Sequence, residues 1–291
     1  MSSASEIRHH IKAVEDTRKI TRAMYMIASS KMKRAMRLHV QNRAYFERVR
    51  SDIKFIMENT EQAFSMNPYY RFHPARQAGF IVVAGDKGLC GSYNAEVLRL
   101  ADQTLKSDLY AREDIFAIGN IACAHFERTN MWVDEEYCHI IQSPDLDNAR
   151  LLTYDICKRF RDKQLDEVYM IYTVLENMNT LRPTVLRMLP VLPEDFSDAP
   201  VLHAPTGNLA FHPSLEEVFE AMVPNYLIGL VYSALVESYA SEHYARMTAM
   251  ENSNRNAEDM LGQLKLQQNH ARQAMITQEI SEIVSGSAVQ W

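Results

Sequence analysis

The chain is poor in the residues that break helices. Only 10 prolines and 9 glycines occur among its 291 residues. Residues 226–285 contain no proline and two glycines, Gly229 and Gly262, and the chain has neither residue type before Pro68. This scarcity argues against a turn-rich all-β fold and favours long helices at both ends. A single helix over the last sixty residues would be about 90 Å long, more than one domain can cover.

Other absences exclude whole classes of protein. No run approaches the roughly 18 apolar residues of a membrane span, and the first ten residues, MSSASEIRHH, lack the apolar core of a signal peptide. We therefore expect a cytosolic chain without a transmembrane segment. The four cysteines form no C-x-x-C pair, so reduced structural thiols are expected, with neither a zinc site nor a disulfide framework.

The overall charge of -6 hides an uneven distribution. Residues 1–58 hold 13 Lys and Arg against 6 Asp and Glu, whereas residues 214–291 hold 4 against 10. A basic first helix and an acidic last helix can attract each other along their length; the alternative is that each is simply a solvated face. The basic helix has few interleaved aromatic residues and the chain is acidic overall, so no nucleic-acid partner is expected.

The first helix shows a narrow apolar seam suited to one partner helix. Ser3 to Glu6 matches a capping box at its start. The seam residues are expected to be Ile7, Ile11, Val14, Met24, Ile27, Met32, Ala35 and Leu38, with gaps at Thr17, Arg18, Thr21 and Lys31.

The middle of the chain alternates between strand and helix patterns. Strands are expected at 79–84, 115–118, 168–174 and 185–191, and helices at 94–106, 121–128 and 148–162. Pro190 assigns the last strand to a sheet edge. This order predicts a small α/β domain with a mainly parallel sheet.

The last helix pattern restarts at a second capping box, Ser214 to Glu217, and Pro224 is expected to kink it or to begin a new segment. A sparse seam of period 3.5 follows, and Gly286 is a plausible C-terminal cap. The seam takes in Met247, Met250, Asn254, Ala257, Leu261, Leu264, Gln268, Ala271, Met275 and Gln278. The predicted domains are residues 1–67, 68–213 and 214–291, a small α/β domain flanked by two helices of a long antiparallel coiled coil.

The glycine-rich loop at 85–92, GDKGLCGS, follows a strand and precedes a helix. It matches neither G-x-G-x-x-G nor G-x-x-x-x-G-K-[ST], so a tight connecting loop is the favoured interpretation and a nucleotide site the alternative. Under that alternative the chain would be a nucleotide-binding α/β enzyme with a helical dimerisation arm. A free-standing coiled-coil adaptor is a third hypothesis.

Three stretches carry a specific resemblance to one family. The chain's IRHHIKAVEDTRKITRAMYMIASSKMKRA, GDKGLCGSYNAEV and ASEHYARMTAMENSNRNAEDMLGQLKLQQNHARQAMITQEISEIVSGSA resemble the gamma subunits of F-type ATP synthases, in the family's order. The resemblance implies a non-catalytic rotor whose terminal helices form an antiparallel coiled coil inside a hexamer of alpha and beta subunits. Such a rotor would couple ion flow through the membrane c ring to ATP synthesis or hydrolysis, and its α/β domain would contact the epsilon subunit and the c ring.

The resemblance also implies roles for particular residues and a location. Loops of the beta subunit would grip Met24, Arg246, Arg272, Gln273, Thr277 and Glu279. An apolar bearing would surround Ile276, Ile280, Ile283 and Val284, and the lower rim of the beta subunit would meet Lys87 and Cys90. No cofactor is implied. The absence of a presequence predicts a bacterial chain bound peripherally at the cytoplasmic face of the plasma membrane, without thiol regulation.

Overall fold

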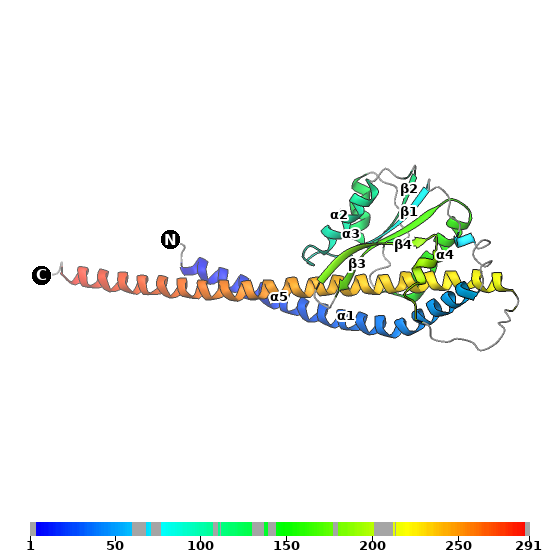
Figure 1. Ribbon diagram of the computed structural model, residues 1–291. Coiled ribbons are helices and arrows are strands. Elements are labelled where there is room, and N and C mark those ends of the chain that lie inside the picture. The colour runs from blue at the N-terminus through cyan, green and yellow to red at the C-terminus, as the bar shows by residue number, and fades with distance from the viewer. Residues whose placement is uncertain are drawn as a thin grey trace. The chain divides into compact units, whose positions relative to one another are not determined.

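A computed structural model describes residues 4–59, 68–70, 77–106, 110, 112–129, 137–138, 144–176, 180–200, 212 and 214–288. Within these ranges the elements follow one another as two long terminal helices with an α/β region between them (Figure 1). In chain order they are α1 (Ala4–Asn59), η1 (Pro68–Tyr70), β1 (Gln77–Val83), α2 (Tyr93–Leu105), β2 (Arg112–Ile118), α3 (Asn120–Arg128), α4 (Leu146–Arg161), β3 (Glu167–Glu176), β4 (Thr180–Leu189), η4 (Pro193–Phe196) and α5 (Leu215–Ala288). By compactness the chain divides into residues 1–29 with 246–291, and residues 30–245. The boundaries expected from the sequence, at 67/68 and 213/214, stay a prediction.

The sheet has the strand order β2-β1-β3-β4. The pairings of β1 with β2 and with β3 are parallel, and β4 runs antiparallel to β3. The expected mainly parallel sheet is confirmed, as is the edge position of the strand that ends near Pro190. That strand starts at Thr180, earlier than expected, and it includes Pro183, which an edge strand tolerates because one side needs no ladder hydrogen bond.

Both faces of the sheet are covered (Figure 1). On one face Phe80 and Val82 of β1 pack with Val97 of α2 and Phe126 of α3. On the other face Ile81 and Val83 pack with residues of α4 and with residues 223–235 of α5. Alternate residues of one strand therefore belong to different cores, which explains why β1 reads as a continuous apolar run.

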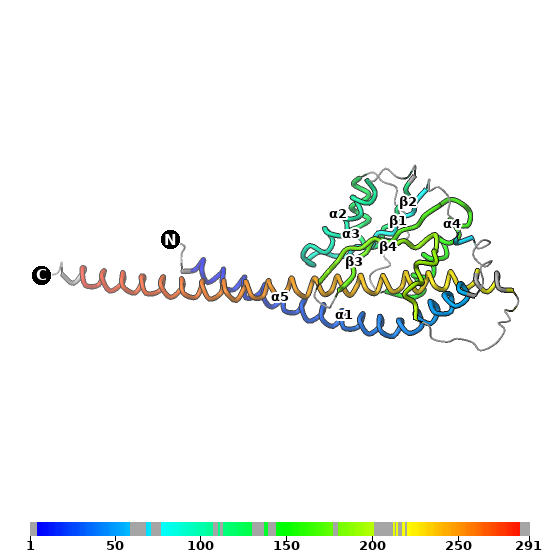
Figure 2. Tube along the Cα trace, viewed as in Figure 1, coloured from blue at the N-terminus to red at the C-terminus, as the bar shows by residue number. Residues whose placement is uncertain are grey.

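A seam of period 3.5 links α1 and α5 within residues 1–29 and 246–291. The two helices run in opposite directions (Figure 2), since Arg18 lies 3.6 Å from Glu258 and Thr21 Oγ1 lies 2.6 Å from Asn254 Oδ1. The seam residues are Ile7, Ile11, Val14, Arg18, Thr21, Tyr25 and Ala28 on α1, and Met250, Asn254, Ala257, Leu261, Leu264, Gln268 and Ala271 on α5, all buried or half-buried. The antiparallel coiled coil is confirmed.

The expected seam of α1 is wrong in part. Thr21, expected in a gap, is 8 % exposed, whereas Ile27, expected in the seam, is 58 % exposed and Ala28 takes the inner position. A small residue at Ala28 lets two helices approach closely, and a search for large apolar residues overlooks it. The α5 seam is confirmed through Ala271, but Met275 is 52 % exposed.

The polar pair in this seam gives a first prediction. Replacing both partners, Thr21→Val with Asn254→Leu, is expected to leave the free energy of unfolding unchanged or to raise it by up to about 1 kcal/mol, because no buried polar group loses its partner. Thr21→Val alone should cost about 1 kcal/mol, because Asn254 then loses its partner. Urea unfolding of the four chains of the cycle measures the coupling, and strictly additive effects would contradict the contact.

The ends of α5 differ from the expectation. The helix continues through Pro224, so the expectation that a new segment begins there is wrong. It also extends past Gly286 to Ala288, so the expected C-terminal cap at Gly286 is wrong. Tertiary packing of residues 223–235 outweighs the backbone hydrogen bond that Pro224 removes. At the start, Glu217 N donates to Ser214 Oγ over 3.2 Å, as the capping box predicts. Ser3 of the other capping box, and residues 201–211 and 213 of the proline-rich connector, lie outside the described residues.

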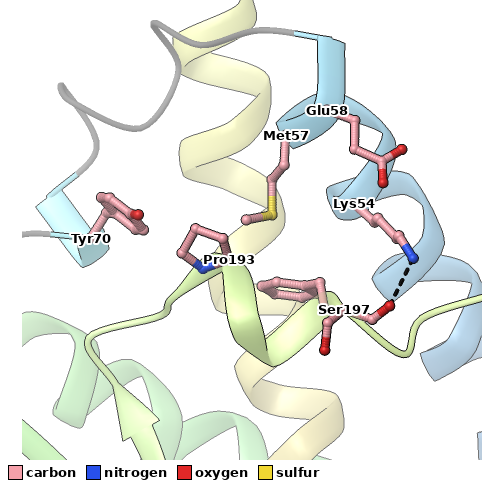
Figure 3. Close-up of a pocket in the computed structure, with 7 residues that line it drawn as sticks. Lys54, Met57, Glu58, Tyr70, Pro193 and Ser197 are labelled. Atoms are coloured by element: carbon pink, nitrogen blue, oxygen red, sulfur yellow. Dashed lines mark hydrogen bonds between the residues drawn. The ribbon is translucent and has the colours of Figure 1, made fainter.

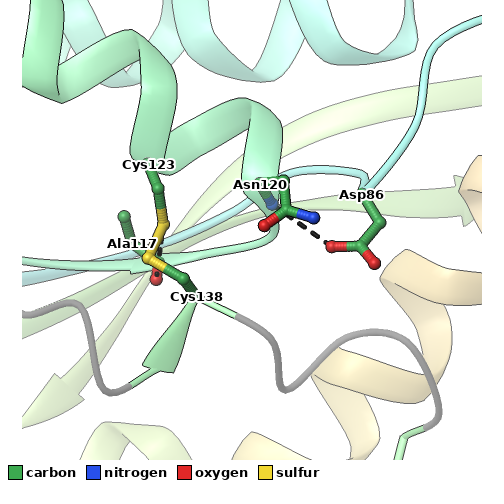
Figure 4. The surroundings of a disulfide bond; sticks show 5 residues. All are labelled: Asp86, Ala117, Asn120, Cys123 and Cys138. Atoms are coloured by element: carbon green, nitrogen blue, oxygen red, sulfur yellow. Dashed lines mark hydrogen bonds between the residues drawn. A yellow bond between two sulfur atoms is a disulfide. The ribbon is translucent and has the colours of Figure 1, made fainter.

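A disulfide joins Cys123 of α3 to Cys138, which corrects the expectation that all four thiols are reduced (Figure 4). The two cysteines are 15 residues apart in the sequence, and this spacing alone does not predict that they meet at the end of β2. Gly119 N donates to Cys138 O at 2.9 Å, directly after β2. Cys90 and Cys157 are buried thiols outside the disulfide, as expected for structural cysteines, and burial raises the pKa of Cys157 to about 12.

The half-buried Glu237 of α5 gives a prediction of pH dependence. Burial raises the pKa of its carboxyl group to about 7, above the 4.5 of an ordinary glutamate. Between these values the folded state binds more protons than the unfolded state, so the free energy of unfolding falls as the pH rises from about 4.5 to beyond 7. Glu237→Gln should flatten this decline in urea titrations at pH 5, 6.5 and 8. The exposed control Glu251→Gln should retain it, and an unchanged slope in Glu237→Gln would contradict the assignment.

Candidate functional surfaces

The end of α5 is the first candidate surface. Every side chain described from Arg272 to Ser285 is exposed. Ile276, Ile280, Ile283 and Val284 are 47, 56, 72 and 60 % exposed, and their spacing sets them on one helical face. Such an apolar stripe on an otherwise polar helix indicates a binding surface for another molecule.

The polar residues expected to contact a partner lie around this stripe. Arg272, Gln273, Thr277 and Glu279 are all exposed, and Thr277 Oγ1 donates to the carbonyl of Gln273 at 2.9 Å, one helical turn back. The Thr277 hydroxyl is therefore bound to its own helix backbone. The long side chains of Arg272, Gln273 and Glu279 extend into solvent, where a partner could contact them.

The structure does not bring two of the expected residues to that surface. Met24 of α1 is half-buried, and Arg246 of α5 is 8 % exposed. Arg246 precedes Arg272 by about 39 Å of helix at 1.5 Å per residue. Any contact that Arg246 makes with a partner would therefore belong to a different surface from that of residues 272–285.

The loop at 85–92 is the second candidate surface. Lys87, Gly88 and Leu89 form an exposed tip, and Gly91 and Ser92 are exposed as well. Leu89 is 65 % exposed and has a φ of 62°. Cys90, by contrast, is 2 % exposed and packs with Tyr93 and Ala245. Lys87 is therefore accessible as expected, whereas Cys90 supports the loop from inside. Leu89 was missed, because an apolar residue between glycines gives no signal of exposure.

Asn94, at the start of α2, holds the loop in place. Its Oδ1 accepts from Gly85 N at 2.8 Å, and its Nδ2 donates to Lys87 O at 3.5 Å and to Cys90 Sγ at 3.2 Å. Sequence reasoning missed this residue, although an Asn that follows a glycine-rich loop is a signal for side-chain to backbone hydrogen bonds.

Loss of these bonds gives a prediction for the loop. Asn94→Ala is expected to cost about 1–2 kcal/mol of local stability, because Gly85 N loses its acceptor. The amides of residues 85–91 should then exchange hydrogen about ten-fold faster or more, which mass spectrometry of deuterated chain measures. Glu96→Ala on the same helix is the control, because the half-buried Glu96 side chain pairs with Arg99 and makes none of the loop's hydrogen bonds that Asn94 makes. Equal exchange in Asn94→Ala and the parent chain would show that the loop does not depend on Asn94.

The same geometry disfavours the nucleotide-binding alternative. A Cβ built at Gly85 would lie 3.0 Å from Asn94 Oδ1 and 3.0 Å from the carboxyl carbon of Glu242, which is itself 4 % exposed. The space beside the first glycine is therefore filled, in part by a carboxyl group, which a phosphate would not tolerate. Among the described residues no group of three or more His, Cys, Asp or Glu side chains could hold a metal ion. No helix in the described ranges is long and apolar enough to cross a membrane.

The fold defines a class of protein with two long terminal helices in antiparallel contact and a mixed-sheet α/β region between them. A model of the ATP synthase family matches residues 3–289. The ATP synthase gamma chain of Caldanaerobacter subterraneus subsp. tengcongensis is 35 % identical over 98 % of this chain and 99 % of that protein. The chain belongs to the ATP synthase gamma chain family.

Solved structures share the fold. A chain of the Tetrahymena thermophila mitochondrial ATP synthase, solved as central stalk and c ring, matches with a TM-score of 0.59 at 23 % identity, covering 80 % of this chain and 98 % of that one. A chain of the Euglena gracilis mitochondrial ATP synthase, in an assembly of OSCP, F1 and c ring, matches with a TM-score of 0.63 at 16 % identity over 99 % and 94 %.

Proposed function

We propose that the chain is the rotor (gamma) subunit of the central stalk of an F-type ATP synthase. In this role it couples ion flow through the membrane c ring mechanically to ATP synthesis or hydrolysis in the alpha/beta hexamer, and it catalyses no reaction itself. Membership of the gamma chain family supports the proposal, as does the antiparallel pair of α1 and α5.

The observation that carries the proposal is the exposed end of α5. Its side chains from Arg272 to Ser285 are solvated, and one apolar stripe of four residues lies among polar ones. A shaft that turns inside a sleeve cannot use one deep hydrophobic interface, because the best-packed orientation would trap it. A narrow stripe surrounded by exchangeable polar contacts keeps such barriers low.

The proposal assigns partners to the two candidate surfaces. The stripe of Ile276, Ile280, Ile283 and Val284 fits an apolar bearing, and Arg272, Gln273, Thr277 and Glu279 fit polar loops of the beta subunit. Met24 and Arg246 would meet further beta-subunit loops at a separate level. At the glycine-rich loop, Lys87 and Leu89 would contact the rim of the beta subunit, with Cys90 beneath them. The α/β region would contact the epsilon subunit and the c ring.

Nucleotide and magnesium would then be held by the partner subunits. The complex would lie at the cytoplasmic face of a bacterial plasma membrane, with this chain attached peripherally.

Coexpression with the cognate alpha and beta subunits tests the proposal. We expect one copy of this chain to copurify per complex, and ATP hydrolysis to rotate a bead fixed to the chain. Full ATPase activity of alpha and beta without the chain would contradict the proposal. Stable homodimers of the isolated chain with micromolar ATP affinity would instead support the nucleotide-binding enzyme.

A further inference from the structure

A pocket of about 460 Å³ lies within residues 30–245, at the end of α1 (Figure 3). Its volume falls within the 300–1,000 Å³ range of small-molecule sites. The lining comes from three elements that are distant in sequence: α1, η1 and η4. The lining residues are Lys54, Met57, Glu58, Tyr70, Pro193, Phe196 and Ser197.

The η4 wall of the pocket is held in place by the rest of this unit. Phe196 is 1 % exposed, and its ring centroid lies 4.9 Å from that of Tyr226 on α5. Asp195 Oδ2 accepts from Leu192 N at 2.8 Å, and Asp195 O accepts from Arg50 of α1 at 3.2 Å. Arg50 also pairs with Asp198. The η4 wall is thus set before any ligand arrives, which limits the ordering cost of binding.

Two charged residues line the pocket, Lys54 and Glu58, and they differ in whether they already have hydrogen-bond partners. Lys54 and Glu58 are one helical turn apart on α1, a spacing that normally pairs them. The Lys54 ammonium instead donates to Ser197 O at 2.9 Å and to Ala199 O at 3.1 Å. Glu58 is exposed and makes no hydrogen bond or ion pair with any residue that the structure describes. The Lys54 ammonium thus keeps its charge but has two of its donors occupied by carbonyl oxygens, whereas the Glu58 carboxylate can accept from a ligand.

We propose that this pocket binds a small organic cation with a flat apolar body. The body would lie among Met57, Pro193 and Tyr70, and the cationic group would pair with Glu58, which lies across the pocket from Tyr70 (Figure 3). Glu58 is the one acidic residue among the described residues of the pocket lining, and a carboxylate at the edge of an apolar cavity favours an ammonium over a neutral or anionic group of the same size.

Three probes with the same indole body test the charge preference: tryptamine, tryptophol and indole-3-propionate. Fluorinated forms are titrated against the full chain by ¹⁹F NMR, with the Met57 methyl shift reporting the location. For ligands of this size we expect a Kd of about 1 mM for tryptamine. It should bind about three-fold more tightly than tryptophol, and indole-3-propionate should bind most weakly.

Two variants make the test specific. Glu58→Gln should remove the preference for tryptamine over tryptophol. It should leave the affinity for tryptophol unchanged, because Glu58 is exposed and glutamine has the same shape without the charge. Asp52→Asn, an exposed acid on the same helix outside the pocket lining, should retain the preference. No Met57 shift at roughly 10 mM tryptamine, tightest binding of indole-3-propionate, or an unchanged preference in Glu58→Gln would each overturn the proposal.

Discussion

A chain that ends at Ala271 is expected to fold as stably as the full chain and to fail as a rotor. Residues 272–285 bury no side chain, so their removal should change the free energy of unfolding by less than about 0.5 kcal/mol. In the assembled complex the same deletion removes the whole apolar stripe. ATP-driven torque and the stability of assembly should therefore fall severalfold, while nucleotide binding at the partner subunits persists.

A seam substitution provides the opposite control. Leu261 is 4 % exposed between α1 and α5, and Leu261→Ala should cost about 2–4 kcal/mol of unfolding free energy through the cavity that it leaves. Circular dichroism in urea measures both variants, and bead rotation measures the torque. A deletion at Ala271 that destabilises the isolated chain as much as Leu261→Ala would show that the end of α5 packs within its own chain. Loss of nucleotide binding at the partner subunits would contradict the proposed bearing.

Gly119→Ala is expected to be the most destabilising glycine substitution among the described residues. Gly119 has a φ of 93°, and a Cβ there would lie 2.2 Å from the carbonyl oxygen of Ala84. Neither backbone segment can move easily, because Ala84 N donates to Ile118 O at 2.9 Å, immediately beside the clash. We expect a loss of about 3 kcal/mol or more in unfolding free energy.

Gly88→Ala is the matched control, because nothing lies within 4 Å of a Cβ built at Gly88. Its unfolding free energy should stay within about 0.5 kcal/mol of the parent. Thermal and urea unfolding of both variants measures the difference. A Gly119→Ala chain as stable as Gly88→Ala would mean that the turn after β2 rearranges without cost.

Much of the fold was predictable because its signals are local. The apolar run at 79–84 predicts a strand, and the absence of proline and glycine before Pro68 predicts a long helix. Both signals depend only on neighbouring residues, and the structure contains both elements, β1 and α1. The pattern of apolar residues alone did not predict that Ala28, and not Ile27, occupies the buried position in the seam. Once two helices pack at period 3.5, position outweighs hydrophobicity, so a small residue is buried and a large one is left in solvent.

The surfaces were predictable to a lesser degree. The stripe from Ile276 to Val284 follows from helical spacing, and its exposure follows from the length of α5 beyond the seam. The interior role of Cys90 depends on packing against Ala245, which is 155 residues away and leaves no local trace. The disulfide between Cys123 and Cys138 likewise depends on how α3 meets the segment at residues 137–138.

The disulfide between Cys123 and Cys138 keeps the chain in one covalent piece when the backbone between these two residues is cut. A protease that cuts any peptide bond between Cys123 and Cys138 would leave two fragments covalently joined. They would migrate as one band on a denaturing gel and separate only after a reductant is added. The backbone between these cysteines is thus the part of the α/β region in which a single cut does not release a fragment.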